Sequence, residues 1–137
     1  MNDDIRELLP RHRSDFERAD AIVSKGYPAV APVLPELFNW LQDCNWPISR
    51  TIAPFLAGLG QPIVPVVRAI LEADDDIWKY WVLTQVVANA AAHVGESLRD
   101  VLTRIDTHPS QGEIIEGARD AAHDILSALG QQPSTDE

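Results

Sequence analysis

The chain has 137 residues, enough for one domain with its own core, and 45% of them are hydrophobic. Its 21 acidic residues outnumber 11 lysines and arginines, so the net charge is -10. This charge repels phosphate backbones and anionic headgroups, and we therefore expect neither nucleic acid nor a membrane as a partner. Fifteen of the acids lie in residues 26–137, so the main body of the chain carries the negative charge.

Cysteine content and hydropathy indicate the compartment. Cys44 is the only cysteine, so no disulfide forms within the chain, and a cytoplasmic location fits best. We interpret Cys44 as a small apolar filler at a helix junction rather than a reactive thiol. Because the first residues lack a basic segment before an apolar run, and no stretch of about 18 apolar residues occurs, we expect no signal peptide and no membrane span.

A short segment repeats along the chain. Gly-Tyr-Pro-Ala-Val at 26–30 returns as Gly-Gln-Pro-Ile-Val at 60–64, and Gly95 follows the second glycine after 35 residues. A spacing of about 30 to 45 residues is typical of stacked helical hairpins, because one hairpin cannot bury its apolar face alone. The repeat predicts a HEAT-like α-solenoid in which turns at Gly26, Gly60 and Gly95 share one edge.

Apolar residues recur at helical spacing and no alternating run is long enough for a sheet, so the chain is predicted to be all-α. Ser14 is the expected N-cap of the first helix, with Glu17 completing a capping box and Gly26 ending it. Prolines in the opening turns should bend the second helix. We expect about seven helices, over residues 14–25, 28–42, 47–58, 61–73, 76–91, 95–106 and 113–129.

The end of the chain is expected to cap the stack. The acidic turn 74–76 supplies an N-cap and favourable charge for the fifth helix. The last helix ends at Gly130, and its buried stripe is predicted at Ile114, Ala118, Ala121, Ala122, Ile125 and Leu129. The resulting domain spans 14–130, after an N-terminal arm, 1–13, and before a disordered tail, 131–137. Residues 1–9 are expected to fray.

Three segments carry a family resemblance. They are Leu-Leu-Pro-Arg-His-Arg-Ser-Asp at 8–15, Asp-Cys-Asn-Trp-Pro at 43–47 and Asp-Asp-Asp-Ile-Trp-Lys-Tyr-Trp at 74–81. In combination they resemble a bacterial family described as domain of unknown function 5071, over most of the chain. That family is a HEAT-like helical repeat, so the resemblance implies this fold. It implies no established activity and no catalytic residue.

The segment 74–81 is the best candidate for a binding site, since it gathers three acids, a lysine and three aromatic residues. Aromatic anchors beside charges are typical of protein interfaces. The alternative is a central helix buried on several sides. Tyr80 and Trp81 fit this core interpretation better, whereas Trp78 is evenly balanced between core and interface. An acidic helix cap explains the three aspartates better than calcium, because the spacing of an EF-hand loop is missing.

Two further features extend this candidate. Gln85 and Asn89 lie seven and eleven positions after Trp78, so a ring and two amides form one helical stripe that can line a groove. Trp46 follows Asp43 as Trp78 follows Asp75, which fits a repeated capping motif or a continuation of the same edge. The candidate binding residues are Asp43, Asn45, Trp46, Asp74, Asp75, Asp76, Trp78, Lys79, Gln85 and Asn89.

No motif indicates a catalytic residue, a metal or a cofactor. His93 and Glu96 have the spacing of two metal ligands, but no second such pair exists. The other histidines have no serine or cysteine constellation to activate. We therefore expect a non-catalytic protein-binding module for a basic partner, such as an immunity protein against a toxin nuclease or an adaptor. The alternative is a small-ligand-binding protein or enzyme with a pocket around Trp78, Lys79, Gln85 and Asn89.

Overall fold

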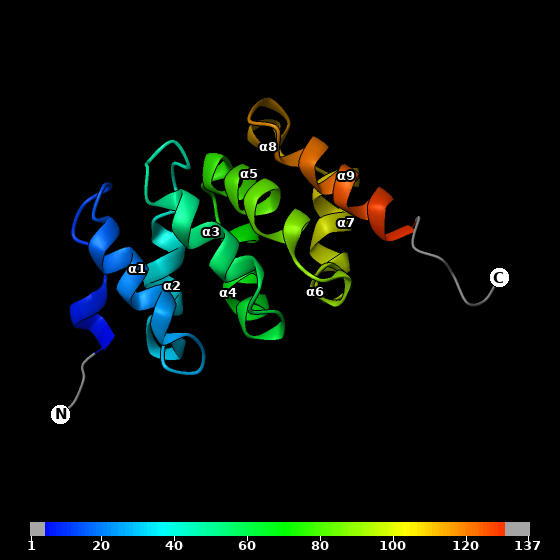
Figure 1. The fold of residues 1–137 in the computed structure, drawn as a ribbon. Helices are drawn as coiled ribbons and strands as arrows, with labels where there is room; N and C mark the ends of the chain where they lie inside the picture. Colours follow the sequence, from blue (N-terminus) through cyan, green and yellow to red (C-terminus); the bar gives the residue numbers. More distant parts are fainter. Residues whose placement is uncertain (1–4, 131–137) are drawn as a thin grey trace.

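The described chain consists of helices and turns. The computed structural model describes residues 5–130, and this range contains nine α-helices, four short 3₁₀-helices and no strand. The all-α prediction is confirmed. Helices α1 to α6, within residues 16–97, follow one another from the N-terminal end of an elongated molecule (Figure 1). The predicted tail, 131–137, and the first four residues of the predicted arm lie outside the described residues.

The described part of the N-terminal arm is packed. The 3₁₀-helix η1 (Ile5–Leu8) and the residue after it place Ile5, Leu8 and Leu9 against the hydrophobic core. Pro10 is buried as well. The expectation of fraying is therefore wrong for residues 5–9, because three apolar side chains in this short segment find a surface to cover.

Asp15, not Ser14, caps the first helix, α1 (Phe16–Lys25). One oxygen of the buried Asp15 carboxylate accepts the N–H of Arg18, and the other accepts the N–H of Arg11. The two oxygens of the Asp15 carboxylate satisfy both donors, and the expected capping box of Ser14 with Glu17 does not form. The backbone hydrogen bond from Arg11 contributes most to lowering the pKa of Asp15.

Two of the three repeated glycines occupy equivalent turns. Gly26 and Gly60 have φ angles of 70° and 76°, in the left-handed region that favours glycine. Gly95 lies inside helix α6 (Ala92–Ser97) instead, where a Cβ atom would meet the Leu129 side chain at 3.1 Å. The third predicted turn is therefore wrong, because the glycine at position 95 serves close packing rather than a turn.

Prolines shorten the second predicted helix. The segment 28–42 contains only a 3₁₀-helix, η2 (Ala31–Val33), and a short helix, α2 (Leu34–Asn39). Each has a proline in its first turn, where the missing N–H is tolerated. The elements that follow lie within their predicted ranges: α3 (Ser49–Ala57), η3 (Gln61–Ile63) and α4 (Val64–Leu71).

The fifth and sixth predicted helices are divided. Helix α5 (Asp76–Gln85) ends six residues early and is followed by η4 (Val87–Asn89). Ala90 then has an extended backbone, with ψ of 166°, which separates η4 from α6. The predicted helix 95–106 corresponds to the end of α6 and to α7 (Arg99–Thr107).

Gly117 interrupts the last predicted helix. Its φ of 90° separates α8 (Gln111–Ile115) from α9 (Ala118–Gly130). Five of the six residues predicted for the buried stripe are buried on α9, as expected. Ile114 is the exception: it lies on α8 and is exposed, because the break at Gly117 turns α8 away from the face of α9.

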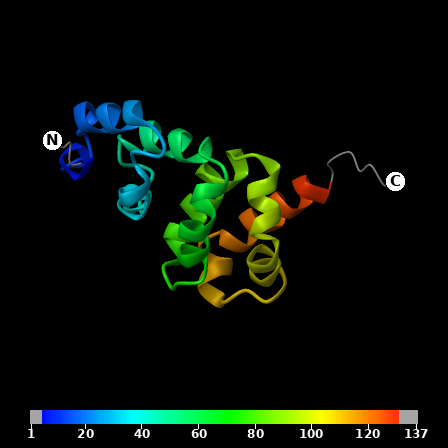
Figure 2. The same cartoon turned by 90° about the horizontal axis from the view of Figure 1, so that it is seen from below.

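Neighbouring helices pack in two series. In the first, α1 contacts α3, α3 contacts α5, and α5 contacts α9. In the second, α2 contacts α4 and α4 contacts α5; at the C-terminal end, α7 packs against α9. In both views α1 to α6 follow one another along the long axis, and the chain then turns back so that α8 lies beside α5 (Figures 1 and 2). The largest fully buried side chains, among them Phe38, Ile52 and Leu102, come from helices along the whole length of the molecule.

No single helix among the described residues is long and apolar enough to cross a membrane. Helix α3 and segment 61–71, which are bent by 112° at the break between them, meet the criterion together by length and composition alone.

Candidate functional site

The acidic turn before α5 serves as a helix cap, as predicted. The Asp75 carboxylate accepts the backbone N–H of Trp78 at 3.0 Å, and Asp76 lies in the first turn of the helix. Asp74 and Asp75 are exposed, and Asp74 has no hydrogen bond or ion pair with residues 5–130. This turn therefore combines one structural carboxylate with one that is free to meet a partner.

Lys79 is buried, with only 4% of its surface exposed, and does not lie at the rim of a surface groove. Its ammonium is 2.8 Å from a carboxylate oxygen of Glu113 on α8 and 3.0 Å from Asp76. Arg104 on α7 binds both oxygens of Glu113, at 2.6 and 2.7 Å. We call Asp76, Lys79, Arg104 and Glu113 the Glu113 cluster; it ties α5, α7 and α8 together.

Glu113 remains ionised although it is fully buried. Burial alone would raise its pKa, but hydrogen bonds from Arg104, Lys79 and the backbone N–H of Ser110 hold the pKa at about 2. Ser110 and Glu113 also form a capping box at the start of α8. Because every polar atom of this side chain has a partner, the cluster is a structural lock rather than a reactive centre.

Trp78 packs against the core. Its indole N–H donates to the carbonyl oxygen of Phe38 at 3.0 Å. The ring also lines an apolar hollow of about 420 Å³ with residues of α2 and α4. Tyr80 and Trp81, predicted to be core residues, are only half-buried and meet edge to face, with ring centroids 5.1 Å apart.

Gln85 and Asn89 line a different hollow, of about 340 Å³, between α5 with η4 and the start of α3. Lys79 lines a third one, beside the Glu113 cluster. The four residues of the predicted small-ligand pocket therefore do not meet in one cavity. Seven residues along a helix correspond to a rise of about 10 Å, so Trp78 and Gln85 share a stripe but face different neighbours.

The junction between α2 and α3 is a turn rather than a helix cap. The Asp43 carboxylate accepts the N–H of Asn45 at 2.9 Å, and Trp46 packs edge to face against Trp40. Helix α3 starts later, at Ser49, without a side-chain cap. Asp43 is thus equivalent to Asp75 in sequence spacing but not in its hydrogen bonds. In the same turn, burial raises the pKa of Cys44 to about 11, as suits an unreactive filler.

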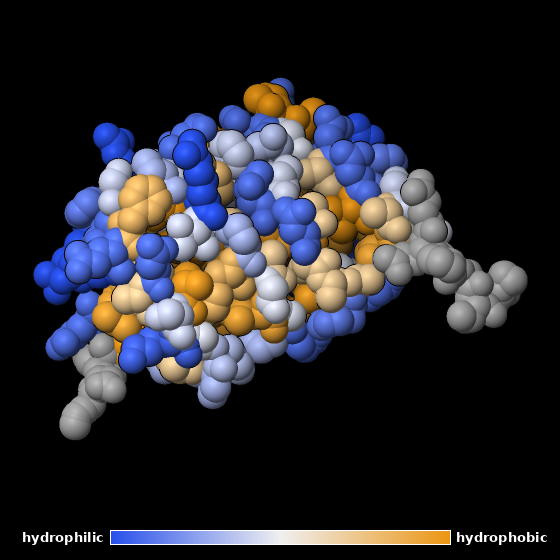
Figure 3. Space-filling view, viewed as in Figure 1, coloured by the Kyte–Doolittle hydropathy of each residue, from blue (hydrophilic) through white to orange (hydrophobic). Residues whose placement is uncertain are grey.

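Ile77 directly follows the acidic turn, and helix α8, which packs beside α5, has two further exposed isoleucines. Ile77, Ile114 and Ile115 are 48%, 52% and 68% exposed. Hydrophobic residues are visible at the surface over α8 (Figure 3). Helix α8 lies along the first turns of α5, since Gly112 adjoins the Asp76 side chain and Gly117 adjoins Tyr80.

Sequence reasoning placed Ile114 on the buried stripe of the last helix. The adjacent isoleucines at 114 and 115 gave no signal of exposure, because adjacent apolar residues can share one buried stripe, as Val101 and Leu102 do on α7. We call Asp74, Asp75, Ile77, Ile114 and Ile115 the α5–α8 face.

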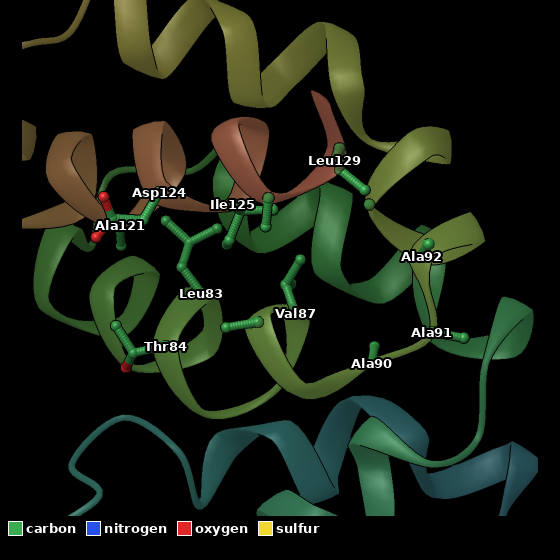
Figure 4. Close-up of a pocket in the computed structure, with 13 residues that line it drawn as sticks. Leu83, Thr84, Val87, Ala90, Ala91, Ala92, Ala121, Asp124, Ile125 and Leu129 are labelled. Carbon is green, nitrogen blue, oxygen red and sulfur yellow. The ribbon is translucent and has the colours of Figure 1, made fainter. Parts of the chain in front are cut away.

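An apolar cavity of about 290 Å³ lies between α5, η4, α6 and α9. Leu83 and Val87 point toward α9 across it, and Ile125 comes from the facing helix (Figure 4). Asp124 is at one end, and alanines form much of the remaining wall. None of the ten candidate binding residues named from the sequence lines this cavity.

Within residues 5–130, no three histidine, cysteine, aspartate or glutamate side chains are arranged to hold a metal ion. The model of a family described as a domain of unknown function, DUF5071, matches residues 8–126. The chain belongs to the DUF5071 family. The DUF5071 match includes the whole Glu113 cluster and the whole α5–α8 face. No curated protein matches the chain significantly.

Proposed function

We propose that this member of the DUF5071 family is a HEAT-like helical-repeat module that binds a basic protein in the cytoplasm. The side-chain hydrogen bonds within residues 5–130 that span most positions along the chain support the repeat, since the five longest are close to one repeat length. The bonded residues are 32 to 40 positions apart in the pairs Arg68–Asp100, Gln61–His93, Lys79–Glu113, Gln61–Ser97 and Trp78–Phe38. Hydrogen bonds between residues about one repeat apart in the chain are expected where each hairpin contacts only its neighbours.

The binding surface that we propose is the α5–α8 face, and its exposed isoleucines carry the proposal. Ile115, at 68% exposure, and its neighbour Ile114 place adjacent apolar side chains in water. Apolar residues grouped on a surface and rimmed by polar ones indicate an interaction site. The unpaired carboxylate of Asp74 lines a hollow together with Gly112 of α8, so negative charge lies close to the helix that carries Ile114 and Ile115.

The charge of the chain favours a basic partner. At -10, the protein attracts cationic surfaces over about 8 Å at physiological salt, and this raises the association rate rather than the lifetime of the complex. A toxin nuclease or the basic tail of an adaptor target has this chemistry. The Glu113 cluster supports the same function indirectly, because it holds α8 beside α5 and so assembles the face before a partner arrives.

The test is a quantitative pull-down from the native host with two variants of the α5–α8 face. Ile114→Ser with Ile115→Ser removes the apolar contact, and Asp74→Asn with Asp75→Asn removes charge while asparagine still caps α5. Asp76 is left intact because it pairs with Lys79. Phe16→Ser is the control, since Phe16 is also exposed, at 42%, but lies on α1.

We expect one or more basic proteins to be captured by the parent and by Phe16→Ser, and to be reduced about tenfold or more by the isoleucine variant. The asparagine variant should slow association at low salt and have little effect at high salt. Identical capture by all four proteins rules out the α5–α8 face. If the proteins lost with the isoleucine variant are acidic, the proposed class of partner is wrong.

A further inference from the structure

Arg50 differs from the other basic residues of the main body. Residues 26–130 contain six lysines and arginines, and five donate hydrogen bonds to described carboxylates or carbonyls: Arg68, Lys79, Arg99, Arg104 and Arg119. The guanidinium of Arg50 has no hydrogen bond or ion pair with residues 5–130, and the residue is exposed. A strongly acidic chain thus leaves one arginine of its described body unneutralised.

Arg50 lines the hollow of about 340 Å³ between α3 and the end of α5. Gln85 and Asn89 line the other side, and no aspartate or glutamate is part of the wall. The remaining lining residues are Cys44, Ser49, Ala53 and Pro54. The volume is in the range of small-ligand sites. It brings together the free arginine and the two amides singled out in the sequence.

The hydrogen-bonding groups left free in this hollow are specific. The Asn89 amide N–H groups donate to the carbonyls of Thr84 and Gln85, which leaves the Asn89 side-chain oxygen as an acceptor. The side-chain oxygen of Gln85 likewise accepts no hydrogen bond from residues 5–130. Burial raises the pKa of Cys44 to about 11, so the thiol adds no negative charge near Arg50.

We propose that this hollow binds a small molecule that carries one carboxylate close to an amide or amino N–H. A guanidinium offers paired N–H donors that match the two oxygens of a carboxylate. The free oxygens of Gln85 and Asn89 accept the N–H of the same molecule. The site uses residues other than those of the α5–α8 face, so its test is independent of the proposed protein partner.

The charge balance favours a monoanion over a phosphate dianion. One arginine neutralises one negative charge, and no second basic side chain lines the hollow. The remaining field of the protein repels a dianion about twice as strongly as a monoanion. The site is therefore a carboxylate site rather than a phosphate site.

The test is a titration of the ¹⁵N-labelled chain with N-acetylglycine at pH 7 and constant ionic strength. We expect saturable shifts of the Nε–H signal of Arg50 and the side-chain amide signals of Gln85 and Asn89. In N-acetylglycinamide a neutral amide replaces the carboxylate. The Kd for this compound should be at least about tenfold higher than the Kd for N-acetylglycine. Arg50→Gln should raise the Kd for N-acetylglycine by a similar factor, and the exposed position leaves the fold intact.

Two controls separate charge from position. Arg99→Gln removes an exposed arginine that pairs with Glu96 outside the hollow, and it should bind N-acetylglycine like the parent. Gln85→Ala should weaken N-acetylglycine but not acetate, which has no N–H to donate. The proposal is overturned by an absence of saturable shifts, by equal binding of N-acetylglycinamide, by an unchanged Kd in Arg50→Gln, or by tighter binding of inorganic phosphate.

Discussion

The ammonium of Lys79 lies 2.8 Å from the carboxylate of Glu113, 34 positions later in the chain, and both side chains are almost completely shielded from water. Two charges removed from water are tolerated only when each is paired and hydrogen-bonded. Asp76 and Arg104 complete those bonds. The position of α8, and with it the position of Ile114 and Ile115, therefore depends on an electrostatic lock rather than on apolar packing alone.

Glu113→Gln should destabilise the protein by about 3 to 5 kcal/mol, because it leaves Lys79 buried without its closest counter-charge. Urea unfolding at pH 7 measures the loss. Glu96→Gln is the matched control, since its ion pair with Arg99 is exposed and should contribute less than about 1 kcal/mol. Equal losses for the two substitutions would show that the buried ion pair contributes no more to the free energy of unfolding than the exposed one.

Acid should weaken the same lock. The pKa of Glu113 in the folded protein, about 2, is below the usual value of about 4.3 for an unfolded chain. Its contribution to stability is therefore complete above pH ~4.5 and is lost as the pH falls toward 2. The free energy of unfolding should fall more steeply over this range in the parent than in Glu113→Gln, and parallel curves would contradict the assignment.

Gly112→Ala should destabilise the protein by about 1 to 3 kcal/mol, because a Cβ atom at this position would overlap the Asp76 carboxylate. Gly130→Ala is the control, since nothing lies within 4 Å of a Cβ there. Thermal unfolding of Gly112→Ala, Asp76→Ala and the double variant forms a cycle. The double variant should lose less stability than the sum of the two single losses. Strict additivity would argue against the overlap between the Cβ atom and the Asp76 side chain.

Trp78→Phe should cost about 1 to 2 kcal/mol of stability, because the carbonyl of Phe38 loses its indole donor. Trp81→Phe keeps the edge-to-face contact with Tyr80 and removes an N–H that bonds to no described residue, so its effect should stay within about 0.5 kcal/mol. Chemical unfolding of both variants distinguishes the two tryptophans. A larger loss for Trp81→Phe would reverse their assigned roles.

Helical spacing and turn chemistry were sufficient to predict the helical class, the cap at Asp75 and the glycine turns at positions 26 and 60. The local sequence pattern did not decide which of two neighbouring residues, Ser14 or Asp15, is the N-cap of α1. The prediction of a turn at Gly95 was also wrong. The sequence alone does not distinguish a glycine that packs closely against Leu129 from a glycine in a turn. Tertiary contact decided both cases.

The candidate site was harder to predict for the same reason. A lysine between Trp78 and Tyr80 resembles the charged rim of an interface, and only its contact with Glu113 on another helix shows that it is buried. The sequence spacing predicted one stripe from Trp78 to Gln85, but the two residues line different hollows. What covers each end of that stripe depends on α2, α4 and α3, which no spacing within α5 reveals.

The longest hydrogen bond within residues 5–130, measured along the chain, is the one from Trp78 to Phe38, which spans 40 positions. The N-terminal helices are therefore not tied directly to α7, α8 or α9, and opening at that end does not expose the core around Leu102. Amide exchange should reflect this, with α1 and α2 exchanging before the helices joined at Glu113. The surface that we assign to the partner thus lies in the half of the molecule that stays closed longest.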